Sequence, residues 1–155
     1  ERGSLQRGEA VVLTDGSVVQ PEDVLGEARS GRTLVLTGDT APAPSVVEAA
    51  AGADLLVHEA TFLADEGVRA RETGHSTAGE AALVAREAGV KLLALTHVSS
   101  RYGGAAVEEE AREVFAATVV PRDFDVIELP FPERGEPRLV PRGARQGRPG
   151  VGSET

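Results

Sequence analysis

The sequence predicts an α/β fold in which helices cover a buried, mostly parallel sheet. Short apolar runs recur at 32–37, 54–58 and 91–96, and each has the length and composition of a buried strand. Helical patterns lie between these runs, and residues 76–89 carry both a start and a stop signal for a helix. Strands that alternate with helices are typical of parallel sheets, because a parallel pair needs a long crossover connection.

The segment before the first core strand is expected to form a β-hairpin. Residues 10–20 contain two short β-type runs that flank Asp15-Gly16, a dipeptide strongly preferred in hairpin turns. The strand predicted at 32–37 follows, and residues 44–52 then have the pattern of a short helix that ends near a glycine.

The clearest predicted helix spans 76–89. Thr77 and Glu80 have the spacing of a capping box, and Gly89 stands where a helix-ending glycine belongs. Its apolar face is expected to contain Ala81, Leu83, Val84 and Ala88.

The rest of the chain is less regular. Residues 61–72 are charged and weakly helical, 105–117 form an amphipathic helical pattern, and 125–129 are predicted to be a last strand. We place the domain at 1–131. The remainder, 132–155, is rich in Gly, Pro and Arg, lacks periodicity, and is predicted to be largely disordered.

Composition narrows the possible functions. The net charge of −9 argues against a chain that holds nucleic acid by charge alone. With no cysteine, any metal must be bound by His, Asp or Glu. No apolar run approaches the roughly 20 residues of a membrane span, so we expect a cytoplasmic protein. The chain starts at Glu1 and contains no Met, which suggests a processed chain or a fragment.

Polar residues suited to chemistry follow the three core strands. Asp39 comes after the first, His58 and Glu59 end the second, and His97 follows the third. His75, the remaining histidine of the three in the chain, directly precedes the capped helix. Because ligands of open α/β sheets bind at the carboxyl ends of the strands, these side chains are candidates for one site.

Each candidate also has a purely structural interpretation. Asp39 is suited to a turn or a helix cap, and we favour a core role for His58. His75 fits the position before a helix cap, and His97 fits a histidine bonded to backbone. Taken together, imidazole and carboxylate groups suit Zn²⁺, although a dinuclear site needs more ligands than these residues supply.

Four segments, in this order and at this approximate spacing, resemble ribonuclease Z, a family of metallo-β-lactamase-fold endonucleases that trim the 3′ end of precursor tRNA. The resemblance covers roughly residues 10–130. The segments are Gly38-Asp39-Thr40, His58-Glu59-Ala60-Thr61-Phe62, His75-Ser76-Thr77 and Leu95-Thr96-His97-Val98-Ser99-Ser100-Arg101-Tyr102.

The resemblance implies a role for each matching residue. Asp39 corresponds to the carboxylate that bridges two zinc ions, and His97 to a terminal zinc ligand. His75 corresponds to the catalytic histidine near the scissile phosphate, and Glu59 is expected to orient it. Arg101 is expected to contact RNA phosphate.

The chain departs from the family in one respect that matters. The His-x-His-x-Asp-His motif, which supplies most zinc ligands and the general base, is absent, as is the flexible arm that grips RNA. We therefore expect the C-terminal αβ half of an αββα sandwich, whose N-terminal half is missing. The complete protein would be a homodimer that cleaves precursor tRNA, and the isolated chain would be inactive.

Two other functions remain open at this point. One is a different metallo-β-lactamase-fold hydrolase, such as a phosphodiesterase or an arylsulfatase relative, which would share ligands like Asp39 and His97. The other is a non-catalytic, truncated partner of a full-length subunit.

Overall fold

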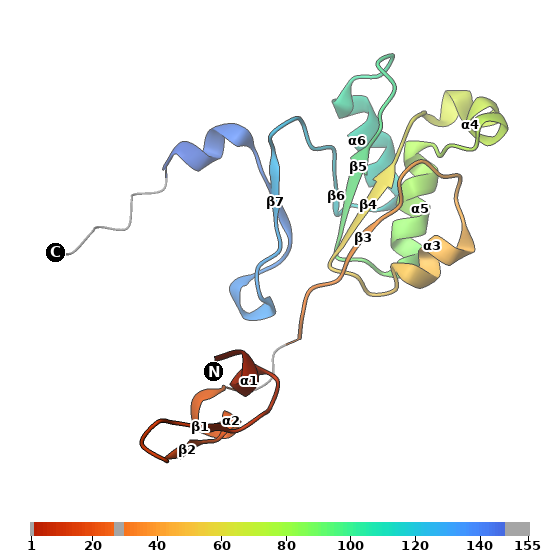
Figure 1. Ribbon diagram of the computed structural model, residues 1–155. Helices are drawn as coiled ribbons and strands as arrows, with labels where there is room; N and C mark the ends of the chain where they lie inside the picture. Colours follow the sequence, from red (N-terminus) through yellow and green to blue (C-terminus); the bar gives the residue numbers. More distant parts are fainter. Residues whose placement is uncertain (1, 27–29, 148–155) are drawn as a thin grey trace. The chain divides into compact units, whose positions relative to one another are not determined.

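The computed structural model describes residues 2–26 and 30–147, and the chain divides into two compact units, 1–31 and 32–155 (Figure 1). In the smaller unit Asp15 accepts hydrogen bonds from the backbone N–H and the hydroxyl of Ser17, at 2.9 and 2.6 Å, and Gly16 has a left-handed φ of 84°. The predicted hairpin is therefore present. The elements of this unit are α1 (Arg2–Gln6), β1 (Val11–Val12), β2 (Val18–Val19) and α2 (Pro21–Val24).

The larger unit is built on a four-stranded parallel sheet of order β3-β4-β5-β6. Its strands are β3 (Leu34–Leu36), β4 (Leu55–Glu59), β5 (Leu92–Thr96) and β6 (Thr118–Val119). The three core strands predicted from sequence are confirmed, and β6 is an addition. Glu59 pairs with Thr96, so β4 and β5 end level with each other.

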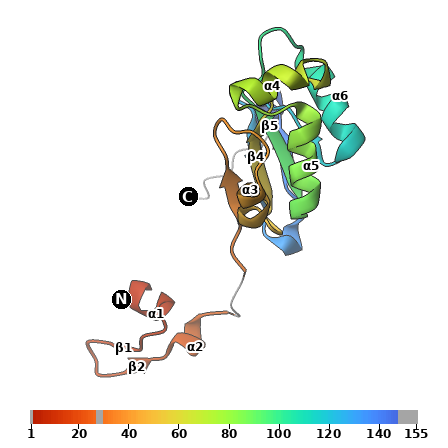
Figure 2. The same ribbon diagram turned by 90° about the vertical axis from the view of Figure 1, so that its right-hand side faces the viewer.

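Helices cover one face of this sheet (Figure 2). They are α3 (Pro44–Ala49), α5 (Ala78–Ala88) and α6 (Gly104–Val114), and all three share one apolar core with β4 and β5. A single 3-10 turn, η1 (Ala64–Glu66), and the short helix α4 (Gly67–Thr73) precede α5. Within the described parts of the chain, no helix has both the length and the apolarity needed to cross a membrane.

The two faces of the sheet bury different side chains because successive residues of a strand point in opposite directions. Leu56, Leu93 and Leu95 belong to the core under the helices. Leu55 and Leu92 belong to a smaller apolar cluster on the other face, against which the chain around β7 packs through Ile127 and Leu129.

Helix α5 has the ends that the sequence predicts. Thr77 accepts a hydrogen bond from the backbone N–H of Glu80 at 3.2 Å, the carboxylate of Glu80 accepts one from the backbone N–H of Thr77 at 2.9 Å, and Gly89 has a φ of 64°. The expected apolar face needs one correction, because Leu83 is 37% exposed. Small side chains take most of the buried positions and let the helix approach its neighbours closely; the buried residues are Ala78, Ala81, Ala82, Val84, Ala85 and Ala88.

The C-terminal region differs most from expectation. Strand β7 (Val126–Glu128) does not join the parallel sheet but pairs antiparallel with β8 (Arg138–Val140), inside the segment predicted to be disordered. The 3-10 turns η2 (Pro132–Arg134) and η3 (Arg142–Gly147) flank β8. Asp125 accepts a hydrogen bond from the backbone N–H of Arg142 at 3.0 Å, which helps to order this segment. Disorder is thus the wrong prediction for 132–147, and residues 148–155 lie outside the described residues.

Candidate metal centre

The polar residues that follow the predicted strands meet at the carboxyl edge of the parallel sheet. Asp39 lies three residues beyond β3, Glu59 ends β4, and His97 directly follows β5. His75 comes from the loop between α4 and α5. Strands that run in parallel end at the same edge, which brings residues distant in sequence into one place.

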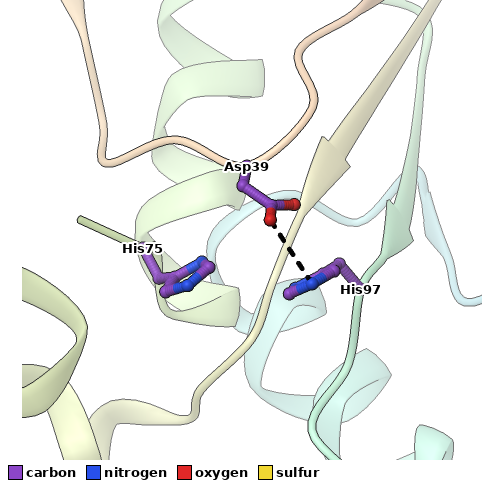
Figure 3. Close-up of side chains that lie close together, drawn as sticks. All are labelled: Asp39, His75 and His97. Carbon is purple, nitrogen blue, oxygen red and sulfur yellow. Dashed lines mark ion pairs between the residues drawn. The ribbon is translucent and has the colours of Figure 1, made fainter. Parts of the chain in front are cut away.

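Asp39, His75 and His97 form a compact cluster (Figure 3). Asp39 Oδ2 lies 3.5 Å from His97 Nε2, and the two imidazole rings stack with centroids 5.4 Å apart at an angle of 13°. One potential ligand atom from each residue lies within 4.8 Å of the others. The side chains of Asp39 and His97 are 57% and 48% exposed, so the cluster is open to solvent.

His97 has an unusual backbone. Its φ is 52°, in the left-handed region that residues other than glycine seldom adopt. Such a conformation is held only where the surrounding structure imposes it, and it occurs preferentially at functional sites.

Glu59 is the buried centre around which the site is organised. Its side chain is 0% exposed, and its two oxygens accept five hydrogen bonds. Oε1 accepts from His75 Nδ1 at 2.8 Å and from the backbone N–H groups of Thr40 and Ser76 at 3.2 Å each. Oε2 accepts from the backbone N–H and the hydroxyl of Thr61, both at 2.9 Å. One carboxylate therefore joins three loops, and the expected pairing of Glu59 with His75 is present.

Thr61 is a site residue to which the sequence analysis gave no role. Its hydroxyl lies 2.8 Å from His97 Nδ1, and its carbonyl accepts a hydrogen bond from the backbone N–H of Ser99 at 3.2 Å. Residues two apart in an extended segment point to the same side, so a hydroxyl two positions after Glu59 was the available signal.

His58 has the core role that we favoured from sequence. It is 0% exposed, its Nδ1 lies 2.7 Å from the carbonyl oxygen of Glu59, and burial lowers the pKa of its imidazole. Its Nε2 has no hydrogen-bond partner within 2–26 and 30–147. Although adjacent in sequence, His58 and Glu59 point to opposite faces of β4, and only Glu59 reaches the cluster.

Arg101 is exposed and forms an ion pair with Glu66 at 3.1 Å. A groove of about 860 Å³ borders His97 on another side and is lined in part by Arg122 and Arg142. Glu108, Asp123 and Asp125 line the same groove, so the surface beside His97 carries side chains of both charges.

The donor atoms of the cluster fit a zinc ion. Carboxylates and imidazoles are ligands that Zn²⁺ accepts, and Asp39 and His97 supply one of each, with the imidazole of His75 beside them. Nδ1 of His75 is bonded to Glu59 and Nδ1 of His97 to Thr61, which leaves both Nε2 atoms available. A second ion would need ligands beyond these three residues.

Comparison with known proteins places the chain in a family. The family model described as a β-lactamase superfamily domain matches residues 4–98. The structure is similar to the metallo-β-lactamase fold protein YhfI from Bacillus subtilis, with 34% identity and a TM-score of 0.54 over 57% of this chain and 36% of that one. The chain belongs to the β-lactamase superfamily, and the predicted metallo-β-lactamase fold is confirmed.

Within this superfamily the similarity is to ribonuclease Z, as the four motifs predict. The chain is 57% identical to Ribonuclease Z from Halobacterium salinarum over 136 residues, which cover 84% of this chain and 43% of that protein. It is also similar in structure to the short form of human tRNase Z, with 31% identity and a TM-score of 0.53 over 74% of this chain and 36% of that one. The chain thus spans less than half the length of the curated relatives that it matches.

Proposed function

We propose that this chain forms part of a zinc-dependent endoribonuclease that removes the 3′ trailer from precursor tRNA. The observation that carries the proposal is the cluster of Asp39, His75 and His97 around the buried Glu59. The cluster lies in a chain that is 57% identical to a ribonuclease Z over 84% of the chain's own length.

The roles proposed for the residues follow from their positions. Asp39 and His97 would hold the zinc, Asp39 through its carboxylate and His97 through Nε2. When bound, the zinc pair would activate the attacking water and offset the charge that develops on the phosphate. His75 donates a hydrogen bond from Nδ1 to Glu59, so its Nε2 is directed away from Glu59. When the ring is protonated, Nε2–H can supply a proton or stabilise charge at the scissile phosphate, and loss of that proton leaves the neutral Nδ1–H ring.

The complete active site requires residues that this sequence does not contain. We propose that the chain is the C-terminal half of the domain and that an N-terminal half supplies the His-x-His-x-Asp-His ligands and the general base. Asp39 and His97 are too few to hold two ions, so the isolated chain should bind zinc weakly and should not cleave RNA. Cleavage of precursor tRNA by the 155-residue chain would contradict this proposal.

RNA contacts are proposed for the guanidinium groups near the cluster. Arg101 contacts a phosphate, for which it must exchange its ion pair with Glu66. Arg122 and Arg142 line the groove beside His97 and offer a path for the RNA backbone. We further propose that the complete protein lies in the cytoplasm and is a homodimer, the latter as the resemblance to ribonuclease Z implies.

Three alanine variants of the complete protein test the assignment of roles. Asp39→Ala and His97→Ala should lose zinc, because each removes a metal ligand. His75→Ala should lower turnover of precursor tRNA strongly, by about 10²-fold to 10⁴-fold, while leaving the zinc content nearly unchanged. Glu109→Ala, at an exposed carboxylate of α6 away from the cluster and the groove, is the control. Loss of zinc from the His75 variant would make His75 a ligand and not the proton donor.

A second function is kept because the chain is also 34% identical to YhfI, a metallo-β-lactamase fold protein. On this alternative the complete protein is another phosphodiester or sulfate-ester hydrolase. Turnover of a small phosphodiester or an aryl sulfate without cleavage of precursor tRNA would favour it.

A further inference from the structure

The hydrogen bonds of Thr61 fix which atoms carry protons. A hydroxyl has one proton to donate and two lone pairs, and an ionised carboxylate only accepts. Backbone N–H donors face both oxygens of Glu59, so both oxygens are acceptors. The Thr61 hydroxyl, 2.9 Å from Glu59 Oε2, therefore donates its hydrogen bond to Glu59. Its contact of 2.8 Å with His97 must then be a hydrogen bond that the hydroxyl accepts from Nδ1–H.

The consequence for His97 is a defined tautomer. With the proton on Nδ1, the lone pair of the neutral ring lies on Nε2, the atom that faces Asp39 Oδ2 at 3.5 Å. His75 is in the same state for a more direct reason, because its Nδ1 donates to Glu59 at 2.8 Å. The Thr61 hydroxyl lies 3.2 Å from the same Nδ1 and can only accept there, since its own proton is directed to Glu59. A neutral histidine in water prefers to carry its proton on Nε2, so the Nδ1–H tautomer of these two rings is imposed by the protein.

We propose that Thr61 is a positioning residue that transmits the effect of the buried Glu59 carboxylate to His97. The Glu59 carboxylate thereby sets the tautomers of both histidines of the cluster. It acts on His75 directly and on His97 through the Thr61 hydroxyl. For its functional meaning the proposal rests on His97 being a zinc ligand. The tautomer itself can be measured without metal.

The side chain of Thr61 can be changed without dismantling the loop. Its backbone carbonyl binds the N–H of Ser99 and its backbone N–H binds Glu59, and neither contact depends on the side chain. Thr61 is only 9% exposed, so valine, which has the same shape, fills the space and removes the hydroxyl alone.

The test is an NMR measurement of histidine tautomers in the ¹⁵N-labelled 155-residue chain, at a pH where the imidazoles are neutral. In the wild-type chain we expect His97 and His75 to carry the proton on Nδ1. In Thr61→Val, His97 should shift to Nε2–H, with protonated and unprotonated nitrogen signals exchanged, while His75 stays unchanged. Thr61→Ser should retain the wild-type pattern.

A matched control removes a hydroxyl from elsewhere. Thr73, in α4, donates only within its own helix, to the carbonyls of Arg69 and Ala70, so Thr73→Val should leave both histidines unchanged. The inference is overturned if His97 carries its proton on Nε2 in the wild-type chain, or keeps Nδ1–H in Thr61→Val. Should Thr61→Val not fold, Thr61→Ala, which also lacks the hydroxyl, takes its place with the same expected result.

A second readout separates this inference from the proposed function. In the complete protein, Thr61→Val should weaken zinc binding by about 10-fold to 100-fold, the usual effect of removing a residue that orients a metal ligand. If the tautomer responds as expected but His97→Ala retains its zinc, the positioning role stands and the metal role of His97 fails. If His97→Ala loses zinc but the tautomer ignores Thr61→Val, only the positioning role fails.

Discussion

Replacing Glu59 by glutamine turns one carboxylate oxygen into an NH₂ group with almost no change in size. The amide oxygen should take the place of Oε1, where His75 and the backbone N–H groups of Thr40 and Ser76 all donate. The NH₂ group then occupies the place of Oε2, where it meets the backbone N–H of Thr61. Two donors face each other there, and neither can be satisfied by the other.

The expected loss of stability follows from this mismatch. A buried donor without a partner costs about 1–3 kcal/mol, and the remaining bonds weaken because their acceptor is no longer charged. Relief of the buried charge offsets part of this loss. We expect Glu59→Gln to lower the free energy of unfolding by about 1–3 kcal/mol, and Glu59→Ala, which leaves all its donors unpaired, by about 3–5 kcal/mol.

Urea denaturation followed by circular dichroism measures this change in the 155-residue chain. The control is Glu109→Gln, at an exposed position of α6, which should change stability by less than about 0.5 kcal/mol. If the Glu59 and Glu109 variants unfold at the same urea concentration, Glu59 does not hold the loops together and our reasoning about the site is wrong.

Three further predictions concern the fold. Thr77→Ala removes the side-chain cap of α5 and should lower stability by about 1 kcal/mol in urea denaturation, whereas Thr77→Ser should not. Leu93→Ala, at a fully buried position of β5, should lower stability by about 2–5 kcal/mol, whereas Leu36→Ala, at a side chain that is 66% exposed, should change it little. The hydrogen bond from Lys91 holds the pKa of Asp54 below its usual value, so the carboxylate's contribution to stability is complete above about pH 4 and lost as the pH falls below it. Thermal unfolding from pH 7 to pH 3 should therefore show a steeper loss for the wild-type chain than for Asp54→Asn.

The parts of the fold that sequence predicts are those with local signals. The strands at 32–37, 54–58 and 91–96 are continuous apolar runs, and α5 carries its own cap and stop, so their positions do not depend on distant contacts. Strand β6 is only two residues long and is defined by its partner β5. Strand β8 lies among Gly, Pro and Arg, and it exists because β7 offers it a partner.

The same distinction applies to the site. Asp39, Glu59 and His97 could be placed together because parallel strands end at one edge. His75 was a candidate for the same site, and its pairing with Glu59 was expected from the resemblance to ribonuclease Z. The role of Thr61, which connects Glu59 with His97, depends on side-chain hydrogen bonds. Spacing in the sequence does not encode such bonds, because they depend on how three separate turns pack.

The arrangement around Glu59 also has a consequence for folding. Apart from the bonds between Glu59 and Thr61, the side-chain hydrogen bonds that build the site span 14 to 36 positions in sequence, from the pair of Thr61 and His75 to the pair of Thr61 and His97. Contacts of this range pay the entropy of loop closure before they contribute energy, so they form after local helices. During synthesis the chain must leave the ribosome as far as His97 before the cluster can assemble. Until then the growing chain presents Asp39, Glu59 and His75 without the last histidine, and the loops that Glu59 joins lack their partner in the segment after β5.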